Sequence, residues 1–429
     1  MGPTREVVVT GVGVISPIGI GTAAFWGSLV EGRSGVRPLR WFQDTGLPKW
    51  IGAEVPDFVP ARMIRQRKAL KLMSRDIQLG VAAADLACNE AGLSAAGIDP
   101  DRLGVIFGAD LIAADLSELS EVYRACTTDG GKFDFRSWGP KGMPALFPLW
   151  MLKYLPNMPA CHIGIIQDAR GPNNTHILGE VSGLTAVSEA VSVIRRGQAD
   201  AMIAGGTSSR IHPAVFIRSR SRQLSERYDE PAAACRPFDA DRDGMVFGEG
   251  AAAFVLETRE RAQARGAKCL ARILGSAAAF EPLRPDRPIQ GIAIQRAIRS
   301  ALASSGLRPS DVGYVSAHGL STTVDDRVEA QAILKTLGEV PVIAPKSYFG
   351  NLGAAGGVVE MAVSVLAFQY GAVPPTLNYR RPDPECPVRV VHGQPMPLDR
   401  PAAILLSHSA TGQAVAMVVA GPGKGDSRP

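Results

Sequence analysis

An internal repeat restricts the folds open to this chain more than any other feature of its sequence. The segment AGLSAAGIDPDRLGVIFGAD (91–110) parallels SGLRPSDVGYVSAHG (305–319), because each contains a helix end, a proline turn and a strand that reaches a glycine. A second pair, AVSVIRRGQA (190–199) and AVSVLAFQYGAV (362–373), ends two helices that follow Gly-rich loops. The repeat predicts two similar halves whose equivalent loops face one another at a cleft, which is a natural place for an active site.

Strands and helices alternate along the chain, and this alternation gives the class of each half. Residues 6–17 (EVVVTGVGVISP) are typical of a buried strand followed by a Gly/Pro turn, and residues 22–32 (TAAFWGSLVEG) of a helix closed by Gly32. Residues 75–93 place apolar and small side chains at helical spacing. The pattern predicts an α/β fold.

The repeat and the local composition suggest where the halves begin and end. We expect an N-terminal half over 1–256 with an insertion around 110–162, a C-terminal half over 257–421, and a disordered tail at 422–429. The insertion contains two of the five Trp residues together with several Pro and many Gly, which indicates a packed excursion and not a regular layer element. Such an insertion forms dimer contacts, lines a ligand or covers a core, and the pattern leaves these three roles open.

Composition excludes several classes of function. Lys and Arg total 46 against 41 Asp and Glu, a net charge of +5, and no dense basic block with interleaved aromatics indicates nucleic-acid binding. The mild basic excess fits an acidic protein partner better. We find no signal-peptide architecture and no apolar run of transmembrane length, and expect a cytoplasmic protein without a membrane span. The six Cys are far apart, no His cluster has metal-ligand spacing and no GxGxxG opens a helix, so we expect neither metal nor cofactor.

Four sequence islands carry the strongest functional signal: GPNNTHILGEVSG (171–183), PFDADRDGMVFGEGAAAFVLE (237–257), SAHGLSTTVDDRVEAQAI (316–333) and PKSYFGNLGAAGGVVE (345–360). In this order they resemble the β-ketoacyl-acyl-carrier-protein synthase family of the thiolase superfold, close to the elongating enzymes of fatty-acid and polyketide synthesis. The likeness runs from about residue 6 to about residue 420. It implies a five-layered α-β-α-β-α sandwich of two similar halves, and a dimer.

The chemistry of the family sets what the site should contain. These enzymes join acyl and malonyl thioesters, both borne on acyl carrier protein, in a decarboxylative Claisen condensation. A thiolate at a helix N-terminus holds the acyl group, because the helix dipole lowers the pKa of the thiol. Two hydrogen-bond donors, two His or a His and an Asn, stabilise the enolate that forms when CO₂ leaves.

The resemblance places Glu180 where the nucleophilic Cys belongs. His318 matches the first donor and Lys346 matches the family Lys, while Asn351 falls near the second donor in a loop one residue shorter than usual. Residues 409–413 (SATGQ) replace the Gly-Phe-Gly-Gly segment that gates the acyl pocket and supplies one N–H to the oxyanion hole. The departures from the family pattern therefore affect the nucleophile, one donor and the gate together.

Glu180 has several interpretations. A carboxylate at a helix N-terminus is stabilised by about 0.3 to 1 kcal/mol, and a contact with His318 or Lys346 would also favour its ionised form. In that interpretation Glu180 fills a buried site from which the thiol was lost. The alternatives are that Glu180 carries the acyl group as a mixed anhydride, or that Ser182, which has no visible base, is the nucleophile.

The other candidate residues also have a structural and a chemical interpretation. His318 with Asn351 would stabilise an enolate, so that decarboxylation without acyl transfer survives, or both are inherited framework. Lys346, Asp326 and Glu329 resemble positions that form a buried charge network near the site, and for these we expect a structural role.

Three functions follow from this resemblance. The first is a chain-length-factor-type subunit that lacks thiol catalysis and pairs with an active β-ketoacyl-acyl-carrier-protein synthase. The second is a malonyl-acyl-carrier-protein decarboxylase that makes the acetyl primer. The third is an atypical 3-oxoacyl-acyl-carrier-protein synthase, an acyltransferase that works without the Cys. All three predict acyl carrier protein as a partner and a homodimer or a heterodimer with a ketosynthase. We favour the first.

Overall fold

A long mixed sheet runs through the protein and is built from two half-sheets. The computed structural model describes residues 5–40, 50–93, 97–219, 223–284 and 286–423. Twelve strands of this part form the sheet, in the order β13-β11-β10-β15-β16-β9-β1-β8-β7-β5-β6 with β2 paired on β1. Their bounds are β1 Val7–Ser16, β2 Gly19–Ile20, β5 Leu103–Ala109, β6 Asn173–His176, β7 Ala201–Ser209, β8 Glu249–Thr258, β9 Ala271–Phe280, β10 Tyr314–Ser316, β11 Pro341–Ile343, β13 Arg389–Val390, β15 Ala402–His408 and β16 Gln413–Ala420.

Strand β1 joins the two half-sheets. All ten of its residues are buried, as its uninterrupted apolar and small composition predicts for a strand covered on both faces. Along most of its length β1 pairs antiparallel with β8 of the first half-sheet, and over Val7–Val9 it also pairs antiparallel with β9 of the second. Two small ladders lie apart from this sheet: β3 (Arg37–Pro38) with β4 (Ile51–Gly52), and β12 (Ala372–Val373) with β14 (Met396–Pro397).

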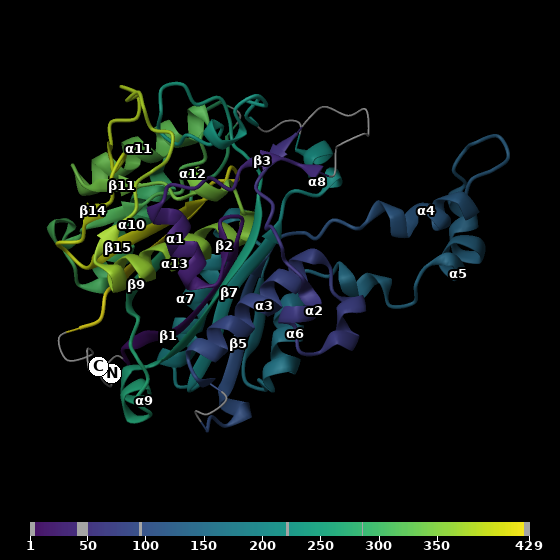
Figure 1. Ribbon diagram of the computed structural model, residues 1–429, viewed down its shortest axis with the longest axis horizontal. Coiled ribbons are helices and arrows are strands. Elements are labelled where there is room, and N and C mark those ends of the chain that lie inside the picture. Colours follow the sequence, from purple (N-terminus) through teal and green to yellow (C-terminus); the bar gives the residue numbers. More distant parts are fainter. Residues whose placement is uncertain (1–4, 41–49, 94–96, 220–222, 285, 424–429) are drawn as a thin grey trace.

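Helices complete five layers, as the resemblance implies (Figure 1). Helices α3 (Arg75–Glu90) and α6 (Met158–Gln167) pack on the outer face of the first half-sheet. Helices α7 (Ser182–Arg195) and α13 (Gly356–Tyr370) contact each other and lie between the half-sheets, in the largest apolar core. Helices α10 (Ile292–Ser305) and α11 (Thr323–Leu337) belong to the outer layer and core of the second half. The remaining helices are α1 Thr22–Val30, α2 Pro60–Met63, α4 Leu116–Ala125, α5 Met143–Ala145, α8 Pro213–Arg218, α9 Arg259–Ala264 and α12 Lys346–Phe349.

The repeat read from the sequence is present in three dimensions. Each central helix follows one turn of 3₁₀ helix: η8 (Gly179–Val181) precedes α7, and η11 (Gly353–Ala355) precedes α13. The two turns contact each other across the interface of the halves. A Cβ on Gly183 would lie 2.6 Å from the carbonyl oxygen of Ala354, so this close approach requires a glycine. The equivalent loops therefore meet, as predicted.

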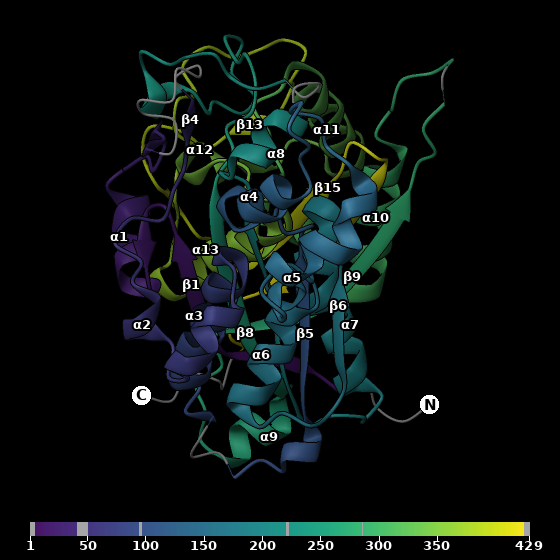
Figure 2. The same ribbon diagram turned by 90° about the vertical axis from the view of Figure 1, so that its right-hand side faces the viewer.

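The segment between β5 and α6 is not a layer element. Figure 1 shows α4 and α5 projecting away from the two half-sheets, and Figure 2 views the molecule from their side. This arm, residues 111–157, carries large apolar side chains that are exposed: Leu111, Leu116, Tyr123, Phe133, Phe135, Met143, Phe147, Leu149 and Met151.

The limits expected for the two halves, 1–256 and 257–421, stay a prediction. Residues 424–429 of the expected tail lie outside the described residues.

One expectation about apolar runs is wrong. The helical stretch Gly353–Tyr370, 18 residues with a mean hydropathy of 1.2, reaches the length and composition of a membrane span. In the structure 83% of it is buried inside the protein, where it forms η11 and the central helix α13. Its apolar character follows from contact with both half-sheets, since α13 packs on β8 and on β15.

Candidate active site

The turn η8 places Glu180 immediately before α7. Gly179 has φ +61°, a left-handed conformation that favours glycine, and the Glu180 side chain that follows is only 4% exposed. Ser182 begins α7; its Oγ donates to the Gly179 carbonyl at 2.7 Å and accepts from the Leu178 N–H at 2.8 Å. The hydroxyl of Ser182 thus holds the turn together. The second half holds Glu180 as well, because Ser407 Oγ on β15 donates to the Glu180 carbonyl at 2.7 Å.

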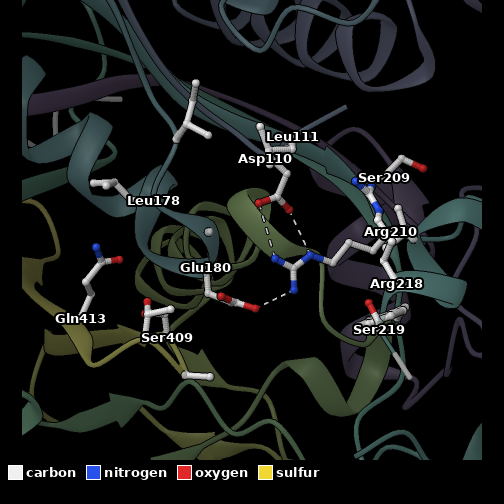
Figure 3. Close-up of a pocket in the computed structure, with 16 residues that line it drawn as sticks. Asp110, Leu111, Leu178, Glu180, Ser209, Arg210, Arg218, Ser219, Ser409 and Gln413 are labelled. Atoms are coloured by element: carbon white, nitrogen blue, oxygen red, sulfur yellow. Dashed lines mark hydrogen bonds and ion pairs between the residues drawn. The ribbon is translucent and has the colours of Figure 1, made fainter. Parts of the chain in front are cut away.

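The side chain of Glu180 belongs to a buried ion triad, Asp110–Arg210–Glu180 (Figure 3). Arg210 Nη1 donates to Glu180 Oε1 at 2.6 Å, and Arg210 Nε donates to Asp110 Oδ2 at 3.0 Å. Arg210 is 8% exposed. Burial alone would lower the pKa of this guanidinium, but the charges of Asp110 and Glu180 outweigh burial and raise it. Arg210 therefore stays charged between the two carboxylates.

Strand order brings the triad together. Asp110 directly follows β5 and Arg210 directly follows β7, and these two strands are parallel neighbours. Their carboxyl ends lie at one edge of the sheet, where α/β proteins usually form their sites. Sequence reasoning missed both residues, although charged side chains at the ends of two adjacent buried strands were the available signal.

The Gly-rich loop of the second half packs against the triad. Gly353 has φ +54°, and a Cβ at this position would lie 2.0 Å from Asp110 Oδ2 and 2.4 Å from Arg210 Nε. The Ala354 N–H donates to Asp110 Oδ2 at 3.3 Å, and Ser208 Oγ donates to the same oxygen at 2.7 Å. The triad thus lies at the contact between the two halves.

A cavity of about 490 Å³ opens beside the triad. Its wall mixes apolar and polar side chains: Leu111, Ile177, Leu178, Val215, Ala410 and Phe247 with Ser209, Arg218, Ser219, Ser409, Thr411 and Gln413, besides Gly179 and the triad itself. Residues of the segment 409–413, where the resemblance places the gate, contribute to this wall. Of the four predicted site residues, Glu180 lines the cavity, whereas His318, Lys346 and Asn351 do not.

His318 and Lys346 form a second buried cluster. Lys346 Nζ lies 3.0 Å from His318 Nδ1 and donates to the His318 carbonyl at 2.8 Å, and it forms an ion pair with Glu360. Because an ammonium group can only donate, the neutral imidazole must accept at Nδ1 and carry its proton on Nε2. That Nε2 is buried without a hydrogen-bond partner among the described residues. Burial, followed by the charges of Lys346, His408 and Arg210, lowers the pKa of His318 well below its usual value.

His408 is part of this cluster and was not singled out from the sequence. Its ring centroid lies 4.5 Å from that of His318, at an interplanar angle of 58°. His408 Nε2 lies 3.7 Å from Glu329 Oε2, within ion-pair range but too long for a hydrogen bond. Burial alone would lower the pKa of His408, but Glu329 outweighs burial and raises it. Its place directly before the segment 409–413, where the resemblance places the gate, was the signal available in the sequence.

The remaining candidates stabilise loops. Asn351 accepts from the Gly353 N–H at 3.0 Å and directs its NH₂ group to the sulfur of Met245 at 3.7 Å. Glu329 accepts the N–H groups of His318 and Gly319 at 2.7 and 2.8 Å. Asp326 accepts three further backbone N–H groups, including that of Phe238 at 2.8 Å. The structure thus groups His318 with Lys346, and gives Asn351 other partners.

The positions of the six cysteines indicate structural roles. None of them lines the cavity, all six are unbridged, and all except Cys161 are buried. Burial raises the pKa of Cys88, Cys235 and Cys386 to about 12, so these thiols stay protonated.

Comparison with known proteins agrees with this architecture. Family models for the N-terminal and C-terminal domains of β-ketoacyl synthases match residues 4–262 and 270–380. The chain is 36% identical over 396 residues to 3-oxoacyl-(acyl-carrier-protein) synthase 2 of Synechocystis sp., covering 91% of this chain and 92% of that protein. The chain therefore belongs to the β-ketoacyl synthase family.

Two solved structures extend the likeness. The ishigamide ketosynthase/chain length factor matches with a TM-score of 0.86 at 29% identity, over 98% of this chain and 100% of that one. A type II polyketide synthase acyl-carrier protein in complex with its ketosynthase matches with a TM-score of 0.85, also at 29% identity and with the same coverage. The fold class predicted from the sequence, a thiolase-like sandwich, is confirmed.

Proposed function

We propose that this protein is a ketosynthase-like subunit of fatty-acid- or polyketide-type synthesis that uses no thiol nucleophile. It acts as the partner of an active β-ketoacyl-acyl-carrier-protein synthase, in the manner of a chain-length factor. The observation that carries the proposal is the ion pair of Glu180 with Arg210 at the start of α7, the position that the family resemblance assigns to the nucleophile.

The ion pair disfavours Glu180 as a nucleophile. To attack a thioester carbonyl, the carboxylate would have to leave a charged guanidinium that is itself buried. Breaking a buried ion pair in this way typically costs several kcal/mol. Ser182 is equally unsuited, because its hydroxyl donates to the Gly179 carbonyl. These contacts support a structural role for the residues at the helix start.

The positions of the predicted donors give less support to the decarboxylase alternative. Enolate stabilisation needs two donors aimed at one oxygen, each about 2.7 to 3.1 Å from it. His318 does not line the cavity, and the Asn351 amide is bonded to Gly353 and directed to Met245. The two side chains therefore do not form an open pair of donors.

The arm and the sheet edge supply surfaces for a protein partner. Strand β6 is at one end of the described sheet and its residues Asn173 and Asn174 are exposed, so one side of this strand offers unpaired backbone groups. Exposed apolar side chains of the arm, such as Phe135 at 76% exposure, are typical of protein interfaces when they gather in this number. We propose that the active ketosynthase binds here, forming a heterodimer.

The reaction test separates the three candidate functions. The purified protein is incubated with malonyl-carrier protein and acyl-carrier protein, alone and together with an intact ketosynthase, and the carrier proteins are followed by intact mass. We expect no change with the protein alone, and chain growth in the complex. Loss of CO₂ with the protein alone would establish the decarboxylase instead, and chain growth with the protein alone would establish an atypical synthase.

The partner surface is tested with two substitutions of exposed apolar residues. Phe135→Ser on the arm is expected to weaken binding to the ketosynthase by about tenfold or more, because large aromatic side chains often dominate interfaces. Val30→Ser on α1, where the side chain is 49% exposed, is the control and should leave binding unchanged. Equal affinities of the two variants, measured by titration, would remove the arm from the interface.

A further inference from the structure

Four charged side chains of the described chain line the cavity, and one of them has no charged partner. Asp110, Glu180 and Arg210 form the triad, whereas Arg218 forms no ion pair with any residue that the structure describes. The Nε of Arg218 donates to the Ala214 carbonyl at 3.2 Å. The two terminal nitrogens of this guanidinium therefore keep their N–H groups for a ligand.

Helix α8 presents one face to the cavity. Val215, Arg218 and Ser219 line it, at the spacing i, i+3 and i+4 that places side chains on one side of a helix. Phe216 holds the helix in place, because its ring stacks on that of Trp50 with the centroids 4.5 Å apart. Ser219 is buried, and its hydroxyl has no hydrogen bond to a described residue. The fold thus places a guanidinium and a free hydroxyl together at the cavity.

The turn between β15 and β16 supplies further polar groups to the lining. Ser409 Oγ and Thr411 Oγ1 lie 2.7 Å apart, so one hydroxyl donates to the other and the second keeps its O–H. The side-chain amide of Gln413 is hydrogen-bonded to none of the described residues. In Figure 3, Ser409 and Gln413 lie on the opposite side of the view from Arg218, and apolar side chains such as Leu178 are also part of the wall. This lining suits a ligand that has an apolar body and carries oxygen atoms.

We propose that the cavity binds a small organic anion with one carboxylate, and that Arg218 and Ser219 bind this carboxylate. A guanidinium matches a carboxylate with two parallel hydrogen bonds, and the Ser219 hydroxyl can donate a third. The triad has two carboxylates and one guanidinium, a net charge of −1, which disfavours a ligand of higher negative charge. The volume of about 490 Å³ is in the range of small-molecule sites. The proposal rests on the proposed function in treating the cavity as a site without a thiol, and extends it by giving the class of ligand.

Isothermal titration calorimetry of the full chain with hexanoate and with hexanamide tests this assignment without any variant. The two probes have the same length and nearly the same shape, and differ in charge. At constant ionic strength we expect hexanoate to bind about tenfold or more tightly, because hydrogen bonds to an ionised group are stronger than neutral ones. Equal affinities, or no binding of hexanoate, would overturn the proposal.

Substitutions then locate the carboxylate. Arg218→Met removes the charge and should lower the affinity for hexanoate to that for hexanamide, whereas Arg218→Lys keeps the charge without the planar fork and should recover part of the loss. Ser219→Ala should weaken binding by about threefold, the effect of one hydrogen bond. Arg299→Met, on an exposed arginine of α10 outside the cavity, is the matched control and should bind as the wild-type protein does. Wild-type affinity for hexanoate in Arg218→Met would contradict the assignment.

A competition experiment checks the class of ligand. Inorganic phosphate should not displace hexanoate at equal concentration, because it is smaller, more highly charged and has no apolar body. Displacement by phosphate would show that the site binds any anion, which contradicts the proposal. The titrations use neither ketosynthase nor carrier protein, so their failure leaves the partner role untouched. Failure to bind a ketosynthase would likewise leave the titrations unaffected.

Discussion

Two buried ion pairs stand at the starts of the two central helices, and they do different work. Glu180 precedes α7 and pairs with Arg210, whose other partner is Asp110. Glu360 lies in the first turns of α13 and pairs with Lys346, whose other partner is His318. The first cluster faces the cavity, whereas the second is fully enclosed. The first ion pair thus belongs to the wall of the cavity, and the lysine of the second fixes the tautomer of a buried histidine.

The difference shows that the presence of a buried ion pair at the start of a central helix does not by itself indicate what the pair does. The Lys346 cluster retains the arrangement that would make His318 a donor. The Asp110–Arg210–Glu180 triad lines the cavity, whereas His318 does not. The role of each buried ion pair depends on the other hydrogen-bond partners of its cation and on whether the pair lines the cavity.

The largest expected effect belongs to the enclosed pair. Lys346→Met leaves Glu360 unpaired in the core and should lower the free energy of unfolding by about 3 to 5 kcal/mol, measured by urea denaturation. Lys346→Met combined with Glu360→Leu should recover most of this loss, because two apolar side chains leave no uncompensated charge. If the double variant is as unstable as the single variant, the charge of Glu360 is not the cause.

Removal of Arg210 should have a somewhat smaller effect. Arg210→Ala removes the cation between Asp110 and Glu180, but both side chains border a cavity that water can enter, so we expect a loss of about 2 to 4 kcal/mol. Arg218→Ala, an exposed arginine of the same cavity, should change stability by less than about 0.5 kcal/mol. Equal losses for the two variants would mean that the triad is not a stabilising unit.

Glu180→Gln makes a smaller change and also tests chemistry. The amide keeps a hydrogen-bond acceptor for Arg210 while losing the charge, so the free energy of unfolding should fall by about 1 to 2 kcal/mol. Chain growth by the complex with an active ketosynthase should proceed at the wild-type rate, followed by intact mass of the carrier protein. Loss of chain growth in a variant that still binds its partner would make Glu180 a catalytic residue.

The smallest effect is a dependence of stability on pH. The folded protein favours neutral His318, since its pKa is well below the ordinary value of 6.5, so the unfolded state binds a proton first as the pH falls. The stabilisation from His318 is therefore present above pH 6.5 and decreases below it, by up to about 1.4 kcal/mol for each pH unit. His318→Gln should lack this decrease relative to the wild-type protein.

For His408, in the same cluster, the stabilisation should depend on pH in the opposite direction. Glu329 raises its pKa in the fold, so its stabilisation is present below pH 6.5 and disappears as the pH rises through the folded value. In His408→Gln the loss relative to wild type should therefore be larger at low pH, as judged from urea denaturation at several pH values. The same sign for the His318 and His408 variants would contradict the opposite directions of their two pKa shifts.

Much of the fold could be predicted from the chain because its signals are local and repeated. The paired segments 91–110 and 305–319 each give a turn and a strand, and the Gly-rich loops before α7 and α13 gave their mutual contact. The run Gly353–Tyr370 reaches the length and composition of a membrane span, contrary to the expectation, because its helix contacts both half-sheets and is buried between them.

The sequence by itself determined the family, the two-half sandwich and the presence of a carboxylate at the start of α7, because each depends on residues close together along the chain. Only the tertiary structure decided what Glu180 binds. Arg210 lies 30 residues after Glu180, and Asp110 lies 100 residues before Arg210. The parallel pairing of β5 with β7 brings Asp110 and Arg210 together. Whether His318 reaches the cavity was equally beyond the sequence, because enclosure depends on the packing of side chains from both halves and not on any single motif.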